Sequence, residues 1–206
     1  EYAKSFPENK DEKSLHEVAL LRLEQQKNRL RFVARHSQDK RAIEVLFIAT
    51  STDYDAKRYH DAILHAQQLL SWGQLVDENN ELKNEYHPNR RILLEASLIK
   101  AHSLYALHNY QLAEQAYIAV LSLMPAKDKR HLSIVENLAA CVFKQAEAMI
   151  ADGKKDMAIS EFLRVGHVAP NSSLRASAEY DAATYLLELK QWPQMIEVLT
   201  AFRQRY

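Results

Sequence analysis

The residues best suited to chemistry are nine histidines, one cysteine and three glycines, and their spacing argues against an enzyme. His60 and His65 are five residues apart, and His102 and His108 are six apart. Neither pair has the i, i+4 spacing of a helical zinc site, and no HExxH sequence occurs. The glycines are scattered, so no glycine-rich phosphate loop can form, and no GxSxG sequence occurs. The sequence therefore predicts no catalytic residue, no metal ligand and no cofactor.

The single cysteine, Cys141, rules out an intramolecular disulfide and any site built from several cysteines. We interpret it as a small core residue. A nucleophilic role would require a histidine beside it in space, which the sequence does not indicate. One buried thiol is compatible with a reducing or an oxidising compartment.

Charge and hydropathy exclude further classes of protein. The 27 basic residues balance 27 acidic ones, so the whole chain lacks the basic footprint of a nucleic-acid-binding protein. The densest basic patch comprises Arg29, Arg31, Arg35, Lys40 and Arg41. Because acidic neighbours balance these charges, we interpret the patch as a solvated helix face and not as a binding site for RNA or lipid headgroups. No apolar run approaches the roughly 20 residues of a membrane helix, so no membrane insertion is predicted. No signal peptide opens the chain.

The elements that must position any functional residue are helices. Only 3 glycines and 5 prolines occur, and strong helix formers abound, which predicts an all-α fold. Ser37 is the predicted N-cap of the second helix, with Asp39 in its first turn. Pro193 suits the first turn of the last helix. Apolar periodicity predicts helices over 10–35, 39–54, 57–72, 94–107, 110–124, 128–152, 155–169, 173–189 and from 192.

One pattern recurs along the chain. With Leu94 as position 1, small residues occupy positions 8 and 20 (Ala101, Ala113), Tyr117 is position 24 and Pro125 is position 32. Units that begin at Ile43, Ala139 and Ala176 agree in phase, although the last has Met195 at position 20. Two helix backbones approach closely where both side chains are small, and a larger residue there would overpack at about 1–3 kcal/mol.

At these residues the chain resembles the tetratricopeptide repeat (TPR) family. The matching sets are Ala101/Ala113/Tyr117/Pro125, Ala146/Ala158/Phe162/Pro170 and Thr50/Tyr59/Ala62, and the match covers most of residues 38–206. Position 4 departs from the family because it never holds tryptophan; it holds Leu46, Ser97, Val142 or Glu179. The uneven linkers are most similar to the divergent repeats of bacterial envelope proteins.

The resemblance implies a right-handed superhelical solenoid of antiparallel helix hairpins, placed in the periplasm or cell envelope, with the cytoplasm as the alternative. It implies a non-enzymatic interaction scaffold that binds a protein or peptide on its concave face. The alternative is an architectural spacer or a self-assembly segment of a larger envelope complex, with self-association through the exposed ends of the array.

The expected organisation assigns TPR-like hairpins to 37–74, 90–126, 127–170 and 171–206. The hairpin at 127–170 has an extended first helix, and the one at 171–206 is expected to be cut. A long flanking helix is expected at 8–36, the end of a preceding repeat helix at 1–7, and an insertion or loop at 75–89. Similar aromatic pairs near both ends suggest a piece of a longer array.

The resemblance also implies that the first helix of each pair lines the concave face. Positions 2, 5, 9 and 12 form one stripe at about 100° per residue. Exposed aromatic residues there are typical interface anchors, although neighbouring helices could cover several of them. The lysine and asparagine set of chaperone-tail binders is missing from these positions. The candidate partner-binding residues are Phe47, Ser51, Tyr54, Leu98, His102, Tyr105, Phe143, Glu147, Tyr180 and Thr184.

Overall fold

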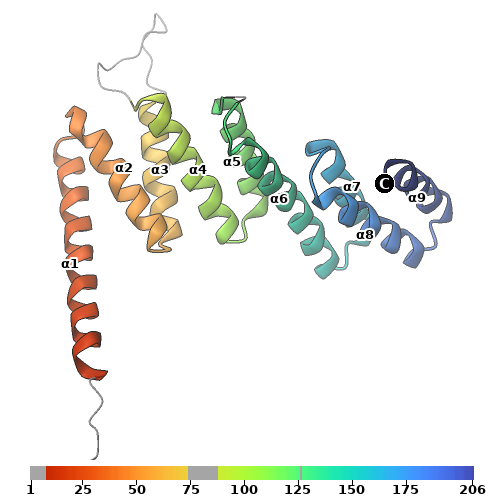
Figure 1. Ribbon diagram of the computed structural model, residues 1–206, viewed down its shortest axis with the longest axis horizontal. Helices are drawn as coiled ribbons and strands as arrows, with labels where there is room; N and C mark the ends of the chain where they lie inside the picture. The colour runs from red at the N-terminus through yellow and green to blue at the C-terminus, as the bar shows by residue number, and fades with distance from the viewer. Residues whose placement is uncertain (1–7, 74–87, 126) are drawn as a thin grey trace, which may run out of the picture. The chain divides into compact units, whose positions relative to one another are not determined.

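The chain is all-helical throughout the part that the structure describes (Figure 1). This computed structural model describes residues 8–73, 88–125 and 127–206, with side chains from residue 17 onward. The predicted helix end at 1–7 and most of the predicted insertion at 75–89 lie outside these ranges. The helices described are α1 (Glu8–Arg35), α2 (Lys40–Asp55), α3 (Tyr59–Trp72), α4 (Arg90–Ala106), α5 (Tyr110–Leu123), α6 (His131–Ala151), α7 (Lys155–Val168), α8 (Leu174–Glu188) and α9 (Trp192–Arg205).

The chain divides into two compact units, residues 1–89 and residues 90–206. In the first unit α1 packs on α2, and α2 packs on α3. In the second unit each helix from α4 to α9 packs on the next one in the chain, and α6 also meets α8. Each helix therefore finds its main partners next to it in sequence, as expected for antiparallel hairpins with short connections. The predicted all-α class is confirmed.

The helix limits follow the predicted ones closely, but one cap differs. Ser37 is not the N-cap of α2. Asp39 holds that position, and its Oδ1 accepts a hydrogen bond from the backbone N–H of Arg41 at 2.9 Å. The prediction of Ser37 was wrong because both residue types cap helices well, and only the backbone decides between them. Pro193 lies in the first turn of α9, as predicted.

Four hairpins turn in the same way at the same position of the repeating pattern. Lys57, His108, Gly153 and Lys190 each occupy position 15 and each adopt a left-handed backbone, with φ of 58°, 59°, 75° and 59°. This conformation ends a helix by satisfying its last carbonyl groups. In the α4–α5 turn, His108 N–H donates to the Tyr105 carbonyl at 2.9 Å.

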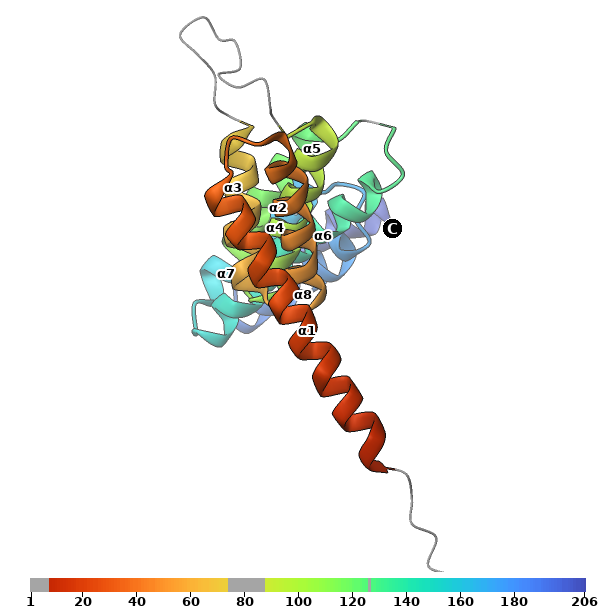
Figure 2. The ribbon, with the colours of Figure 1, turned by 90° about the vertical axis from the view of Figure 1, so that its left-hand side faces the viewer.

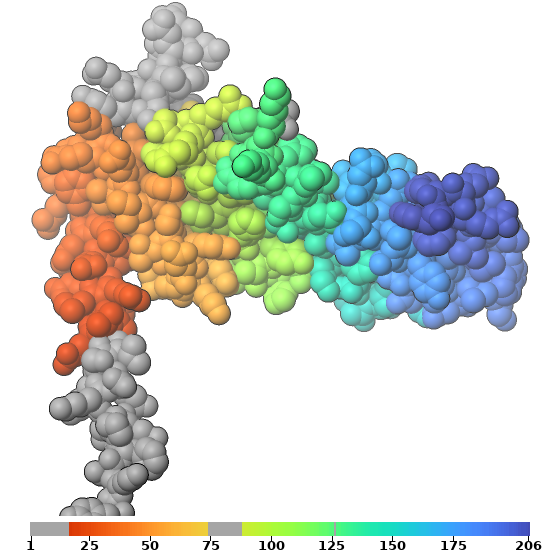
Figure 3. Space-filling view, viewed as in Figure 1, coloured from red at the N-terminus to blue at the C-terminus, as the bar shows by residue number. Residues whose placement is uncertain are grey.

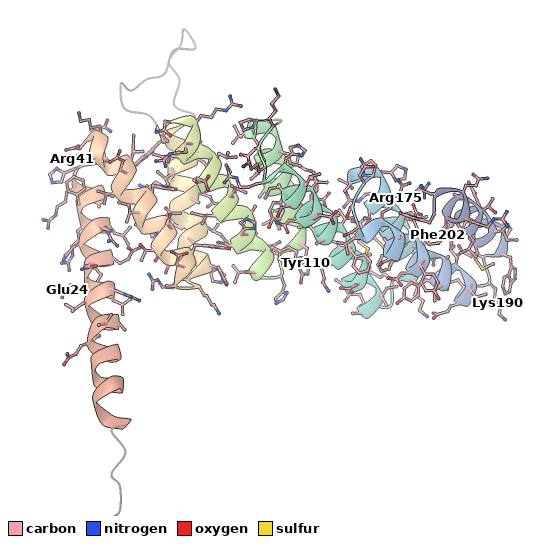
Figure 4. All side chains as sticks on the ribbon, viewed as in Figure 1. Glu24, Arg41, Tyr110, Arg175, Lys190 and Phe202 are labelled. Carbon is pink, nitrogen blue, oxygen red and sulfur yellow. The ribbon has the colours of Figure 1, made fainter. Side chains whose placement is uncertain are left out.

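The second bond of this turn recurs as well. Asn109 N–H donates to the Leu104 carbonyl at 3.0 Å. The corresponding N–H groups of Arg58, Lys154 and Gln191 make the same bond at 2.8, 2.8 and 2.9 Å. Figure 4 labels Lys190 in the last of these turns. Because the backbone turn is the same, the two helices of each hairpin have a similar orientation relative to each other.

Small residues of the repeating pattern are buried in the core. Ala101 of α4 and Ala113 of α5 are fully buried, and so are Ala146 of α6 and Ala158 of α7. These are the alanines that the pattern placed at closest approach. The large residues at position 24, Tyr117 and Phe162, are buried too, as are Thr50 and Ala62 in the first unit.

A buried carboxylate joins three helices of the second unit. Arg164 of α7 donates to both carboxylate oxygens of Glu114 on α5, at 2.5 and 2.8 Å, and also pairs with Glu161. Gln145 of α6 donates to Glu114 at 2.7 Å. The bond from Arg164 lowers the pKa of Glu114; burial raises it, and the bond from Gln145 lowers it again, so the net direction is downward. Glu114 is therefore ionised at neutral pH and fixes α5, α6 and α7 together.

A second buried carboxylate organises the first unit. Asp53 accepts two hydrogen bonds from Arg58, at 2.9 and 2.7 Å, and one from Gln26 of α1 at 2.9 Å. His65 Nδ1 lies 2.8 Å from Oδ2 of Asp53, the oxygen that also accepts the bond from Gln26, whereas both bonds from Arg58 go to Oδ1. Gln26 thereby attaches α1 to α2 (Figure 2), where α1 runs beyond the helices that follow it. Several apolar residues of α1 remain exposed: Val18, Leu20, Leu21 and Leu23.

Replacing Lys190 by glycine should stabilise the protein. The left-handed backbone costs a residue with a Cβ about 1–2 kcal/mol, and glycine loses about 0.5–1 kcal/mol of that gain to chain entropy. We therefore expect Lys190→Gly to raise the free energy of unfolding by up to about 1 kcal/mol. Urea denaturation measures it. Lys190→Ala keeps the Cβ and should give no gain, and a gain equal to that of glycine would contradict the turn assignment.

Glu114→Gln should destabilise the protein by about 1–3 kcal/mol at neutral pH, because Arg164 and Gln145 lose a charged partner. Because the pKa of Glu114 is lower in the folded state, its ionised form stabilises the fold fully above the unfolded pKa of about 4.3. This stabilisation is lost as the pH falls through the folded pKa. The difference from wild type, measured by urea denaturation, should therefore shrink below about pH 4. Glu188→Gln breaks an exposed pair with Lys155 and should cost about 0–1 kcal/mol. A pH-independent loss for Glu114→Gln would exclude this ionic role.

Candidate binding surface

The predicted partner-binding residues of the second unit separate into covered and exposed groups. Leu98 of α4 is only 5% exposed and lies in the core. Phe143 of α6 is half-buried, and its ring packs edge-on against Phe162 of α7 at 5.1 Å between centroids. Both residues therefore serve helix packing, although they lie on the predicted stripe.

His102 of α4 also takes part in helix packing. Its Nδ1 lies 2.7 Å from the hydroxyl of Tyr117 on α5, and the two rings meet edge to face. Burial lowers the pKa of His102, although Glu95 opposes this effect. The imidazole is therefore uncharged at neutral pH, and its contact with Tyr117 links the two helices of one hairpin.

Tyr105, near the end of α4, reaches the neighbouring helices. The centroid of its ring lies 5.3 Å from that of Tyr110, the first residue of α5. Figure 4 labels Tyr110. Burial raises the pKa of Tyr105, and Tyr110 raises it further. Lys144 and Glu147 of α6 are close enough to influence the same hydroxyl. The end of α4 and the middle of α6 therefore share one side of the second unit.

The same side continues from α6 to α8. Lys144 and Glu147 form an ion pair at 2.5 Å on α6. Burial raises the pKa of Asp181 on α8, and the charge of Glu147 raises it further. Glu147 of α6 and Asp181 of α8 are therefore close enough to interact electrostatically, and their helices are in contact. Within the described parts of the chain, no cation pairs with Asp181.

Two more predicted residues complete this side. Tyr180 precedes Asp181 on α8 and is 63% exposed. Thr184 is also exposed, and its hydroxyl donates to the carbonyl of Tyr180 at 3.0 Å. We call the set of Tyr105, Lys144, Glu147, Tyr180, Asp181 and Thr184 the first-helix surface. It combines the exposed ring of Tyr180 and the half-buried ring of Tyr105 with more acidic than basic charge.

Sequence reasoning missed three residues here: Tyr110, Lys144 and Asp181. Lys144 and Asp181 both occupy position 6 of the pattern. On a helix position 6 lies about 40° from position 2 and about 60° from position 9, so a wider stripe would have included them. Tyr110 begins a second helix, and only the hairpin turn brings it to Tyr105.

The three remaining candidates belong to α2 in the first unit. Phe47 is half-buried, and its carbonyl accepts a hydrogen bond from the hydroxyl of Ser51 at 3.1 Å. The ring of Tyr54 lies 6.0 Å from that of Tyr59 in a tilted arrangement. Burial raises the pKa of Tyr54. These residues line one side of α2 within the unit of residues 1–89.

The described residues hold no group of three or more histidine, cysteine, aspartate or glutamate side chains that could bind a metal. Cys141 is fully buried, and burial raises the pKa of its thiol to about 12, so the thiol is protonated at neutral pH. Over the same residues, every helix is too short or too polar to span a bilayer.

Comparison with known proteins adds no relative to this picture: no protein-family model matches the chain, and no curated protein does.

The carboxyl group of Asp181 should titrate above the ordinary aspartate value of about 3.9. Glu147→Gln removes the nearby negative charge and should lower that pKa, while burial keeps part of the shift. Carboxyl carbon shifts in an NMR titration measure both values. Glu188→Gln removes a charge from the same helix and should leave Asp181 unchanged. If Glu147→Gln has no effect, the two carboxylates do not interact.

Proposed function

We propose that this chain is a non-enzymatic scaffold of the TPR type that binds a peptide or protein partner. Four hairpins with the same turn support the repeat assignment, as do buried small residues at the positions of closest approach. In this proposal the hairpins stack into a right-handed superhelix, and their first helices line its concave side.

The observation that carries the proposal is the exposure of Tyr180 beside two neighbouring carboxylates. A tyrosine that remains 63% exposed offers an apolar ring and a polar hydroxyl to a partner. Burial raises the pKa of Asp181, and the negative charge of Glu147 raises it further. A lysine or arginine of a bound peptide would be attracted to both carboxylates and could contact the ring of Tyr180. The partner that fits best is therefore a peptide with a basic residue next to an apolar one.

We place the protein in the periplasm or cell envelope, with the cytoplasm as the alternative. The similarity of its uneven repeats to those of bacterial envelope proteins supports this location. Fractionation of cells that express the full-length gene, with antibody detection, tests it. Recovery with cytoplasmic markers would favour the alternative.

A second candidate function is an architectural spacer or self-assembly segment. The exposed apolar residues of α9, including Trp192 and Ile196, favour it. Light scattering over a range of concentrations separates the two functions: self-assembly predicts a mass that rises with concentration, whereas a scaffold for other partners remains a monomer.

Tyr180→Ala and Glu147→Gln should each weaken peptide binding at least tenfold, because they remove the exposed ring and one of the two carboxylates. Peptides selected from a random display library against the wild-type chain provide the probe, and fluorescence anisotropy gives the affinity. The selected peptides should be enriched in lysine or arginine, and their binding should weaken as salt increases.

Ile118→Asp is the matched control, since Ile118 is exposed on the second helix α5, and it should bind as wild type does. Phe143→Ala is unsuitable as a probe, because loss of its packing on Phe162 should cost about 2–4 kcal/mol of stability. Equal losses for Ile118→Asp and Tyr180→Ala would place the binding site elsewhere.

A further inference from the structure

A groove lies between α7 and α9 in the second unit. α8 packs on both helices, and its buried residues Glu179 and Leu186 form the base of the groove. The volume is about 580 Å³, within the range of small-molecule sites. The surface of α9, which forms one wall, is dark blue in Figure 3. We call this feature the α7–α9 groove. Its apolar lining residues are Ile159, Leu163, Leu186, Val198 and Ala201.

The corresponding space between α5 and α7 is filled by side chains of the protein. There Arg164 of α7 reaches across to Glu114 of α5, which also accepts a hydrogen bond from Gln145 of α6. Because alanine replaces this bridging arginine in the next hairpin, the α7–α9 groove stays open and has an apolar middle. The residues that take the places of Arg164, Glu114 and Gln145 are Ala201, Ile159 and Ala182.

One end of the groove carries two arginines that share one carboxylate. Arg175, which Figure 4 labels, donates through Nε to Glu179 at 2.8 Å. Arg205 donates through Nη1 to both oxygens of Glu179 at 2.6 Å. No described residue accepts a hydrogen bond from Nη2 of either arginine. Two positive charges therefore meet one negative charge, and N–H donors remain for a second anion.

The other carboxylate of the groove, Glu197, lies away from this end. It precedes Arg205 by eight residues on α9, which is about 12 Å along the helix axis. Gln194, one turn earlier on α9, also lines the groove. The groove thus has a cationic end, an apolar middle and a polar end. An anionic group is attracted to the cationic end, and an apolar group attached to it would lie along the middle.

An alkyl chain suits the apolar middle better than a polypeptide does. The walls are helix faces whose backbone groups are already bonded within the helices, so an extended segment against them would leave its own backbone groups without partners. A helix is about 10–12 Å across, and about 12 Å of its length would need roughly 1,000 Å³, more than the groove offers. The same limits hold for a partner protein, a second copy or a further segment of this chain.

We propose that the α7–α9 groove binds a small amphiphilic carboxylate of the fatty-acid type. The carboxylate of the ligand pairs with Arg175 and Arg205, and its alkyl chain lies on Leu163 and Val198. Guanidinium groups suit this head group because they donate two parallel hydrogen bonds to a carboxylate. The lining residues are not part of the first-helix surface, so the proposal is independent of peptide binding there.

Octanoate is the probe, titrated into the 206-residue chain and followed by isothermal titration calorimetry. We expect saturable binding at a single site. Octanol has the same alkyl chain without the charge, and octylammonium reverses the charge, so each should bind at least tenfold more weakly. Equal affinities for octanoate and octanol would overturn the role of the arginines. Absence of octanoate binding would overturn the site itself.

Three variants locate the ligand. Ala201→Leu fills the space that Arg164 fills between α5 and α7, and it should abolish octanoate binding. Arg205→Gln removes one charge and should weaken octanoate binding at least fivefold without changing that of octanol. Arg203→Gln is the matched control, since Arg203 is exposed on the same helix and does not line the groove; it should bind as wild type does.

Thermal unfolding shows whether each variant is folded, and Arg205→Gln tests the site even if leucine at position 201 disturbs the packing. Wild-type affinity in both Ala201→Leu and Arg205→Gln would place octanoate elsewhere and contradict the proposal. An acidic peptide, selected by display, that binds the wild-type chain but not Ala201→Leu would also contradict it, because the groove would then belong to a protein partner.

The same titration of the full-length gene product tests whether the groove is open in the whole protein. We expect the affinity for octanoate to equal that of the 206-residue chain. Loss of binding in the full-length product alone would mean that another part of the protein covers the groove, and it would overturn the proposal.

Discussion

The structure depends on one backbone turn repeated at a fixed interval. Each turn requires a residue in the left-handed conformation, and three of the four residues that adopt it are not glycine: Lys57, His108 and Lys190. Two backbone hydrogen bonds stabilise this strained residue in every case. The turn sets how the two helices of a hairpin approach each other. In three of the four hairpins positions 8 and 20 both hold small residues, whereas the last hairpin has Met195 at position 20.

The features of the fold that could be predicted are those encoded by local sequence signals. Small residues at a fixed spacing and helix-forming composition are local signals, and the helix limits agreed with them. The choice of cap at α2 was wrong because Ser37 and Asp39 have nearly equal propensity. The candidate surface was predicted only in part, because a stripe at helical period identifies a side of a helix but not what covers it. Leu98 and Phe143 lie on that stripe beneath neighbouring helices.

Buried carboxylates could not have been assigned from periodicity. Glu114 pairs with Arg164, which lies 50 residues away in sequence. Glu179 occupies a position that is leucine or valine in two other hairpins, and it accepts hydrogen bonds from Arg175 and Arg205. Hydrophobic patterns treat such residues as solvent-facing, whereas the structure buries them with cationic partners. Loss of one partner would leave a buried charge, so these contacts specify how successive helices align.

The first-helix surface is held in place by ionic contacts of the helices beneath it. Arg205 of α9 pairs with Glu179 of α8, which immediately precedes the exposed Tyr180. Glu179 is buried and also accepts a hydrogen bond from Arg175, so loss of one arginine leaves a buried charge with a single partner. These contacts fix α8 against α9, and they therefore fix the helix that presents the ring of Tyr180.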